Sequence, residues 1–168
     1  GGQRGGNRRG RHCPAAPPRA MTDRPEHWNP LAPAEDYVPL AGASIGFGIL
    51  LGTALVAAVL LGVRALVAQG PPTDQPDPNQ PAAVLLIFGT LGACGVAALS
   101  CWTALAPVSL YRRGGLSMVT AFATFVMALL LTPVNELGGA AGLGLAAVAC
   151  GAGAWALGRR IRRLRAGR

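Results

Sequence analysis

The chain has 168 residues, of which 51% are hydrophobic and 24 more are glycine. Only 13% of the residues are charged, against about 25% in an average soluble domain. This balance excludes a disordered chain and a disulfide scaffold, and the length excludes a large multidomain enzyme. The composition is typical of a membrane protein.

All 15 basic residues are arginine, and the formal net charge is +8. Arginine without lysine, together with abundant alanine, glycine and proline, suggests a GC-rich and therefore bacterial genome. The charge would also suit a nucleic-acid partner. However, eleven arginines lie before Met21 or after Gly158, and no aromatic residues alternate with those that end the chain. We therefore expect no nucleic-acid partner.

The first 36 residues are expected to form a disordered or flexible cytoplasmic segment. Residues 1–20 consist mainly of Gly, Arg and Pro and show no apolar periodicity, which indicates disorder. One hypothesis is that Met21 is the native start and that residues 1–20 do not belong to the native protein.

Four stretches of the remaining chain contain no charge, and each reaches the 18 to 20 or so residues that a helix needs to span a membrane. None alternates with the two-residue period of a barrel strand. Because lipid admits only helices and closed barrels, the sequence predicts an all-α integral membrane protein with four transmembrane helices in a compact antiparallel bundle. The predicted transmembrane domain is 37–158, with spans at 40–63, 83–106, 116–132 and 137–158.

The segments between these spans predict the connections. Five prolines in 69–81 make this segment a stiff polar loop. The second connection is predicted at 111–115 and the third at 132–136. In the third, Asn135 would cap the next helix and Glu136 would face its positive N-terminus. Such a short link predicts that the third and fourth helices pack as an antiparallel hairpin.

Arginine placement predicts the orientation. The second connection and the C-terminal tail are basic, whereas the other two connections contain only acids, Asp74, Asp77 and Glu136. The positive-inside rule then puts both termini in the cytoplasm of a bacterial cell with the bundle in its cytoplasmic membrane. The tail, 159–168, would lie on anionic lipid with Ile161 and Leu164 towards the acyl chains. The arginines expected to contact lipid headgroups and fix the topology are Arg112, Arg113, Arg159, Arg160, Arg162, Arg163 and Arg165.

Arg64 is the one charge that closely follows an apolar run without belonging to a basic cluster. It could serve as a transport or interface charge, with Asp74 or Asp77 as its partner. A helix would place it about 38 Å from Pro39, beyond a hydrocarbon core of about 30 Å. This distance favours a guanidinium that snorkels to the outer interface.

Small residues at four-residue spacing predict helix packing, because they let backbones approach closely in lipid. Chance spacing is the rival explanation in a chain with 24 glycines. The residues predicted to pack are Gly42, Gly46, Gly48, Gly52, Gly138, Gly142, Ala147 and Gly151.

Other polar residues in the spans point to little chemistry. Thr120 and Thr124, one turn apart, could line a polar seam, but such hydroxyls usually bond to the carbonyl one turn earlier. The four cysteines form no metal-ligand spacing and are read as small buried hydrophobes. No His, Asp, Glu or Lys lies inside the four runs. We therefore predict no catalytic residue, metal site or cofactor.

The sequence thus favours a non-enzymatic structural or accessory membrane subunit. Its expected partners are anionic lipid headgroups and either a second copy of the chain or a larger membrane complex. One alternative is a small oligomeric channel or transporter that uses Arg64 and the Ser and Thr residues between protomers. Another is a holin-like protein that permeabilises the membrane and also carries a basic tail.

Overall fold

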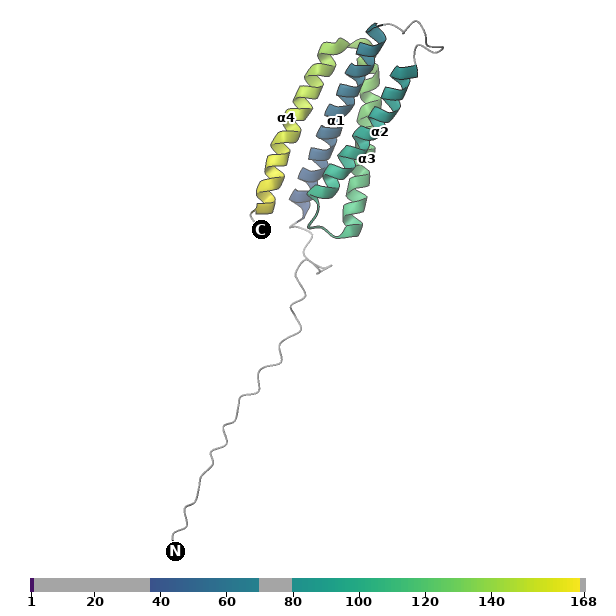
Figure 1. Ribbon diagram of the computed structural model, residues 1–168. Helices are drawn as coiled ribbons and strands as arrows, with labels where there is room; N and C mark the ends of the chain where they lie inside the picture. Colours follow the sequence, from purple (N-terminus) through teal and green to yellow (C-terminus); the bar gives the residue numbers. More distant parts are fainter. Residues whose placement is uncertain (2–36, 70–79, 167–168) are drawn as a thin grey trace.

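The computed structural model of this chain describes residue 1, residues 37–69 and residues 80–166 (Figure 1). These contain four α-helices, α1 (Val38–Gln69), α2 (Gln80–Ala104), α3 (Leu110–Leu137) and α4 (Gly139–Ala166), and no strand. All four are long and apolar enough to cross a bilayer. The prediction of an all-α integral membrane protein with four transmembrane helices is confirmed. The predicted N-terminal segment and most of the proline-rich loop lie outside the described residues.

The connection between α2 and α3 lies earlier in the chain than predicted. Two turn-forming hydrogen bonds, from Ala106 N–H to Thr103 O and from Val108 N–H to Leu105 O, follow the end of α2. Pro107 has no N–H and cannot continue the helix. Residues 111–115, predicted as the connection, instead form the first turns of α3, so that prediction was wrong.

The connection between α3 and α4 was also misplaced. Pro133, Asn135 and Glu136 lie within the last turns of α3, and the single residue between the two helices is Gly138. The chain reverses at Gly139, whose φ of 69° is in the left-handed region that glycine adopts without strain. Asn135 and Glu136 therefore end α3 instead of beginning α4.

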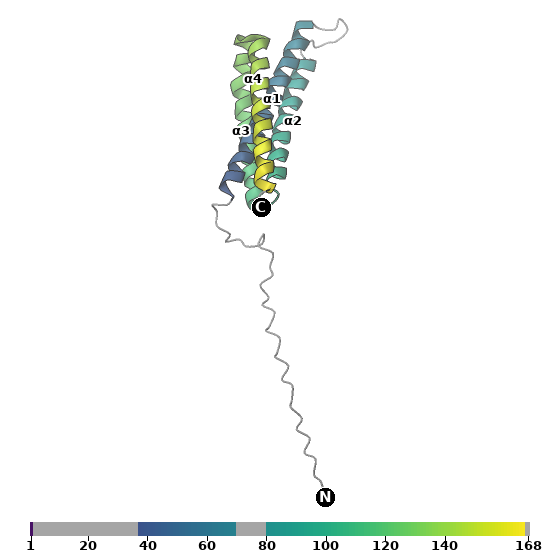
Figure 2. The ribbon, with the colours of Figure 1, turned by 90° about the vertical axis from the view of Figure 1, so that its left-hand side faces the viewer.

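Helix α1 lies at the centre of the arrangement and packs against α2, α3 and α4. The two views in Figures 1 and 2 show the helices side by side, with their axes running along the length of one bundle. Helix α4 rests mainly on α1 and makes few contacts with α3, although one residue joins them. The predicted hairpin of the third and fourth helices is thus antiparallel, but α4 packs against α1 instead of α3.

Large apolar side chains cover the outside of the bundle, and four hydroxyl side chains are buried inside it. Ser44, Thr53, Thr120 and Thr124 are buried, whereas Met118 and Phe122 on α3 are 77% and 68% exposed. Each buried hydroxyl donates to the carbonyl four residues earlier, at 2.7 to 2.9 Å. Large apolar side chains on the outside suit contact with lipid. Thr120 and Thr124 thus bond to the carbonyl one turn earlier, as the sequence favoured over a polar seam.

Gly48 and Gly52 form a seam of small residues on α1, against which side chains of α2 and α3 pack. A Cβ atom at Gly48 would lie 2.5 Å from Thr120 Cγ2 and 3.0 Å from Ala97 O, and one at Gly52 would lie 2.5 Å from Thr124 Cγ2. The threonine methyl groups of α3 fill the space that the two glycines leave. Dispersion contacts of this kind hold helices together in lipid.

The other residues predicted to pack behave differently. Gly46 faces Leu157 Cδ1 of α4, where a Cβ would be 3.2 Å away, and Gly138 belongs to the turn. A Cβ at Gly42, Gly142 or Gly151 would have no neighbour within 4 Å. Ala147 is half-buried on α4. The same four-residue spacing therefore marks tight contacts within this chain at Gly48 and Gly52 and open surface at three other glycines.

Replacing Gly52 by alanine is expected to lower the free energy of unfolding by about 1 to 3 kcal/mol, because the new methyl group would overlap Thr124. The control is Gly151→Ala, which meets open space and should stabilise α4 by roughly 0.5 to 1 kcal/mol. Denaturant titration in detergent micelles measures both changes. Equal stability of the two variants would contradict the close approach at Gly52.

Candidate functional site

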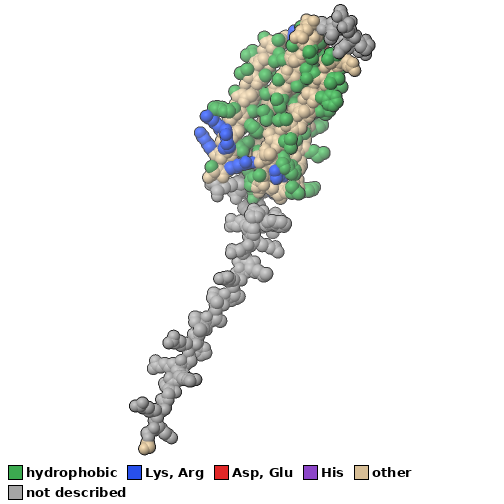
Figure 3. Space-filling view, in the orientation of Figure 1, with side chains coloured by type: hydrophobic (Ala, Val, Ile, Leu, Met, Phe, Trp, Pro, Cys, Tyr) green, Lys and Arg blue, Asp and Glu red, His purple; other side chains and the backbone are tan. Residues whose placement is uncertain are grey.

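The described arginines are divided unequally between the two ends of the bundle. Seven of the eight lie at the end where α2 and α4 finish and α3 begins. Figure 3 shows the blue side chains gathered there, with apolar side chains over the flanks. The single described acid, Glu136, lies in the last turn of α3 at the opposite end. The bundle therefore has one strongly basic end, which we call the basic end.

Two of these arginines close the C-terminus of α2. The Arg113 Nε–H donates to Trp102 O at 2.6 Å, and its guanidinium lies 4.2 Å from the centre of the Trp102 ring. Arg165 donates through Nη2 to the carbonyls of Thr103 and Ala104. The last carbonyls of a helix have no partner within it and carry its negative dipole end. Arg113 from α3 and Arg165 from α4 thus join three helices at this point.

The other arginines of the basic end point outward. Arg159 stacks on Trp155 one turn earlier, with 3.8 Å between the guanidinium carbon and the ring centre. Arg112, Arg160, Arg162 and Arg163 are exposed. These four have no hydrogen-bond or ion-pair partner among the described residues. Tyr111, next to Arg112 on α3, is 93% exposed. Exposed Tyr and Trp next to arginine are typical of the membrane interface.

The basic tail does not form a separate segment. Helix α4 continues to Ala166, and Ile161 is 5% exposed in a cluster with Leu40 and Leu105. Leu164 packs against the same cluster. The prediction that Ile161 and Leu164 turn to the acyl chains was wrong, because the helical period keeps them on the face that α4 already turns to α1.

Arg64 closes a helix end on the opposite side of the bundle. Its Nη1–H donates to Asn135 O at 2.7 Å, in the last turn of α3. Nη2 lies 3.9 Å from where a Cβ on Gly139 would be. Asp74 and Asp77, the partners considered from the sequence, lie outside the described residues. This bond could not be predicted from the sequence, because it joins residues 71 positions apart.

The contacts of the arginines define two levels along the length of the bundle, one near each end. Arg64 lies level with Asn135 and Gly139 at one end. From Gly139 to Arg159 there are 20 helical steps, which is about 30 Å, the thickness of a hydrocarbon core. On α1, Gly46 lies beside Leu157 near the second level. The intervals 44–64, 84–104, 116–136 and 139–159 lie side by side, and each has the length that is needed to cross one bilayer.

Few groups able to carry out chemistry lie between the two levels. Cys94, Cys101 and Cys150 are free thiols, and Cys13 lies outside the described residues. No three His, Cys, Asp or Glu side chains cluster in the part of the chain that the structure describes.

An apolar groove of about 450 Å³ between α1 and α2 is lined by residues such as Val59, Gly89 and Gly92.

The fold and the arginine positions define a small multi-pass membrane protein. Comparison of the chain with protein-family models, with curated proteins and with solved structures finds no match.

Removing the side chain of Arg165 should destabilise the basic end. Arg165→Gln leaves carbonyls at the end of α2 without their cationic donor, so we expect a loss of about 1 kcal/mol in the free energy of unfolding. Arg163→Gln removes the same charge from the same helix and should change stability by less than about 0.5 kcal/mol. Unfolding in detergent compares the two variants. Equal losses would indicate that net charge, not the bonds to α2, carries the effect.

Proposed function

We propose that this protein is a non-enzymatic structural or accessory subunit of a bacterial cytoplasmic membrane. The observation that carries the proposal is the closure of the interior at Gly48 and Gly52, with the buried hydroxyls bonded to their own helices. Such an interior stabilises the bundle and leaves the outer faces for association.

The two edges of α4 that border its exposed side chains are the surfaces best suited to another helix. Gly142 and Gly151 leave open space at these two edges, since nine residues correspond to about 180° around a helix, and α4 contacts mainly α1 within the chain. Small residues facing lipid permit close approach of a second helix. The partner is a second copy of the chain or a helix of a larger membrane complex.

The proposed orientation places the basic end in the cytoplasm, with both termini on that side. This follows from the positive-inside rule and from seven described arginines at one end. The use of arginine for all 15 basic residues supports the bacterial assignment.

Reporter fusions test this orientation. A fluorescent protein fused after Arg168 should fluoresce, because it folds in the cytoplasm, and alkaline phosphatase inserted within 70–79 should be active, because it needs the outside. The reverse pattern, with an active phosphatase at the C-terminus and none in the loop, would contradict the orientation.

Purification in mild detergent tests the accessory role. The protein should co-purify as an oligomer or with a larger complex, and Gly142→Leu with Gly151→Leu should release it without unfolding, because leucine would fill the open space. Gly95→Leu, at an open position on α2, is the matched control. A monomer in native mass spectrometry, unchanged by either variant, would contradict the proposal.

Liposome flux separates this role from a channel or transporter. The Arg64 guanidinium donates a hydrogen bond to Asn135 O and so links α1 to the end of α3. Because this structural role accounts for the charge without transport, we expect no ion or solute flux by the purified protein. Flux that is lost on Arg64→Ala would support transport instead, and lysis of cells on expression would support a holin-like role.

A further inference from the structure

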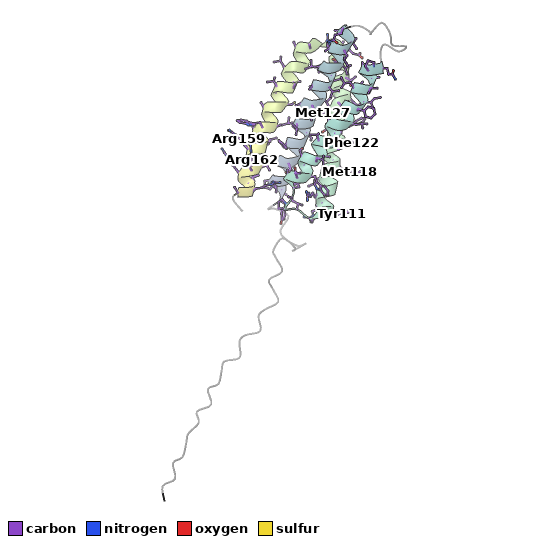
Figure 4. The ribbon with its side chains drawn as sticks, in the orientation of Figure 1. Tyr111, Met118, Phe122, Met127, Arg159 and Arg162 are labelled. Carbon is purple, nitrogen blue, oxygen red and sulfur yellow. The ribbon has the colours of Figure 1, made fainter. Side chains whose placement is uncertain are left out.

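One face of α4 combines exposed arginines, an indole and an apolar strip. At about 100° per residue, Trp155, Arg159 and Arg162 fall on the side of the helix opposite Ile161. Ile161 is buried towards α1, and the other three are exposed. Figure 4 shows Arg159 and Arg162 projecting away from the other helices. We call this surface the outer face of α4.

The same face continues as an apolar strip deeper in the membrane. Leu145 and Val148 are 72% and 71% exposed and lie two turns and one turn, respectively, before Ala152, which is also exposed. By the helical period, Ala152 lies on the same side of the helix as Val148 and Trp155. An extended hydrocarbon chain fits such a strip, since every side chain along it is apolar.

The arginines lie at the depth of lipid headgroups. Arg159 is 20 helical steps, or about 30 Å, from Gly139 at the other level. The flat face of the Arg159 guanidinium stacks on the Trp155 indole, with 3.8 Å between the guanidinium carbon and the ring centre. The N–H groups at the edge of the guanidinium remain available to donate hydrogen bonds. Arg162, one turn further, has no hydrogen-bond or ion-pair partner among the described residues.

Charge complementarity favours a phosphate. Guanidinium groups bind phosphate oxygens through two parallel N–H bonds, and they do so best when their position is fixed in advance. No Asp or Glu of the described residues lies at the basic end to neutralise these arginines. The nearby apolar strip selects a phosphate that is attached to an acyl chain.

We propose that the outer face of α4 binds one anionic phospholipid. Arg159 and Arg162 hold its phosphate, Trp155 contacts the glycerol region, and an acyl chain lies over Ala152, Val148 and Leu145. This inference rests on the proposed contact with anionic headgroups and makes it specific, since Arg112 and Arg160 contribute only diffuse charge. It does not depend on the accessory role or on which end faces the cytoplasm.

Fluorescence of Trp155 in nanodiscs tests the site, with Trp28 and Trp102 replaced by phenylalanine. Phosphatidylglycerol brominated near the headgroup should quench Trp155 several-fold more strongly than equally brominated phosphatidylcholine. Both leaflets carry the same lipid, so the orientation of the protein does not affect the result. Equal quenching by the two lipids would overturn the proposal.

Charge-matched variants separate a site from general attraction. Arg159→Gln with Arg162→Gln should abolish the preference for phosphatidylglycerol, and Arg112→Gln with Arg160→Gln should keep it. Equal loss in both pairs would overturn the proposal in favour of diffuse charge. Quenching is normalised to unbrominated lipid, which corrects for any change in Trp155 emission when Arg159 is replaced.

Lysine variants test the geometry of the phosphate contact, and inorganic phosphate tests whether the ligand is a lipid. Arg159→Lys with Arg162→Lys keeps the charge and should at least halve the preference, because an ammonium group cannot make the planar bidentate contact. An unchanged preference would overturn the proposed geometry. Inorganic phosphate, added at matched ionic strength, should leave the quenching by brominated phosphatidylglycerol unchanged. Relief of quenching would assign the site to free phosphate instead of lipid.

Discussion

The hydrocarbon core of a bilayer cannot solvate a charge or an unpaired backbone carbonyl, and this constraint organises the molecule. The described arginines lie towards the two ends of the bundle, and Arg159 is 20 helical steps, or about 30 Å, from Gly139 at the level of Arg64. At one level Arg64 bonds to the end of α3, and at the other Arg113 and Arg165 bond to the end of α2. The same side chains thus mark the membrane boundaries and satisfy helix ends that lie there.

Between these levels the bundle depends on close packing around α1. Gly48 and Gly52 admit the methyl groups of Thr120 and Thr124, whose hydroxyls are occupied within α3. Above and below this seam, two apolar clusters fill the remaining interior, one around Leu40 and Leu105 and one around Val56 and Leu143. Helix α4 is held mainly by α1 and, at its basic end, by the bonds of Arg165 to α2.

Long apolar runs made the four helices predictable, because length and hydropathy alone decide whether a segment can span lipid. Their ends were less predictable. Pro133 suggested a loop but lies inside α3, while the chain actually reverses at Gly138 and Gly139, a glycine pair that follows the last apolar residue and could have served as the signal. A helix tolerates a proline when neighbouring groups compensate, and sequence spacing does not reveal this.

Pairings between helices were the least predictable. The sequence placed Arg113 and Arg165 at one end, but their carbonyl partners on α2 depend on how α3 and α4 meet that helix. Likewise, Gly48 with Gly52 and Gly142 with neighbouring small residues share one spacing, and only the arrangement of helices makes one contact tight and leaves the other open. Spacing identifies a small-residue face, whereas tertiary structure decides what it faces.

The position of the bilayer along the bundle can be measured directly with single nitroxide labels on the outward positions of α3, in a protein without its native cysteines. Collision rates with oxygen and with a water-soluble nickel complex give the depth of each label in lipid vesicles. Labels near Val126, midway between the two arginine levels, should be deepest, and depth should fall symmetrically towards Arg112 and Leu137. A deepest point displaced by about two helical turns or more, or nickel access along the whole helix, would contradict the account.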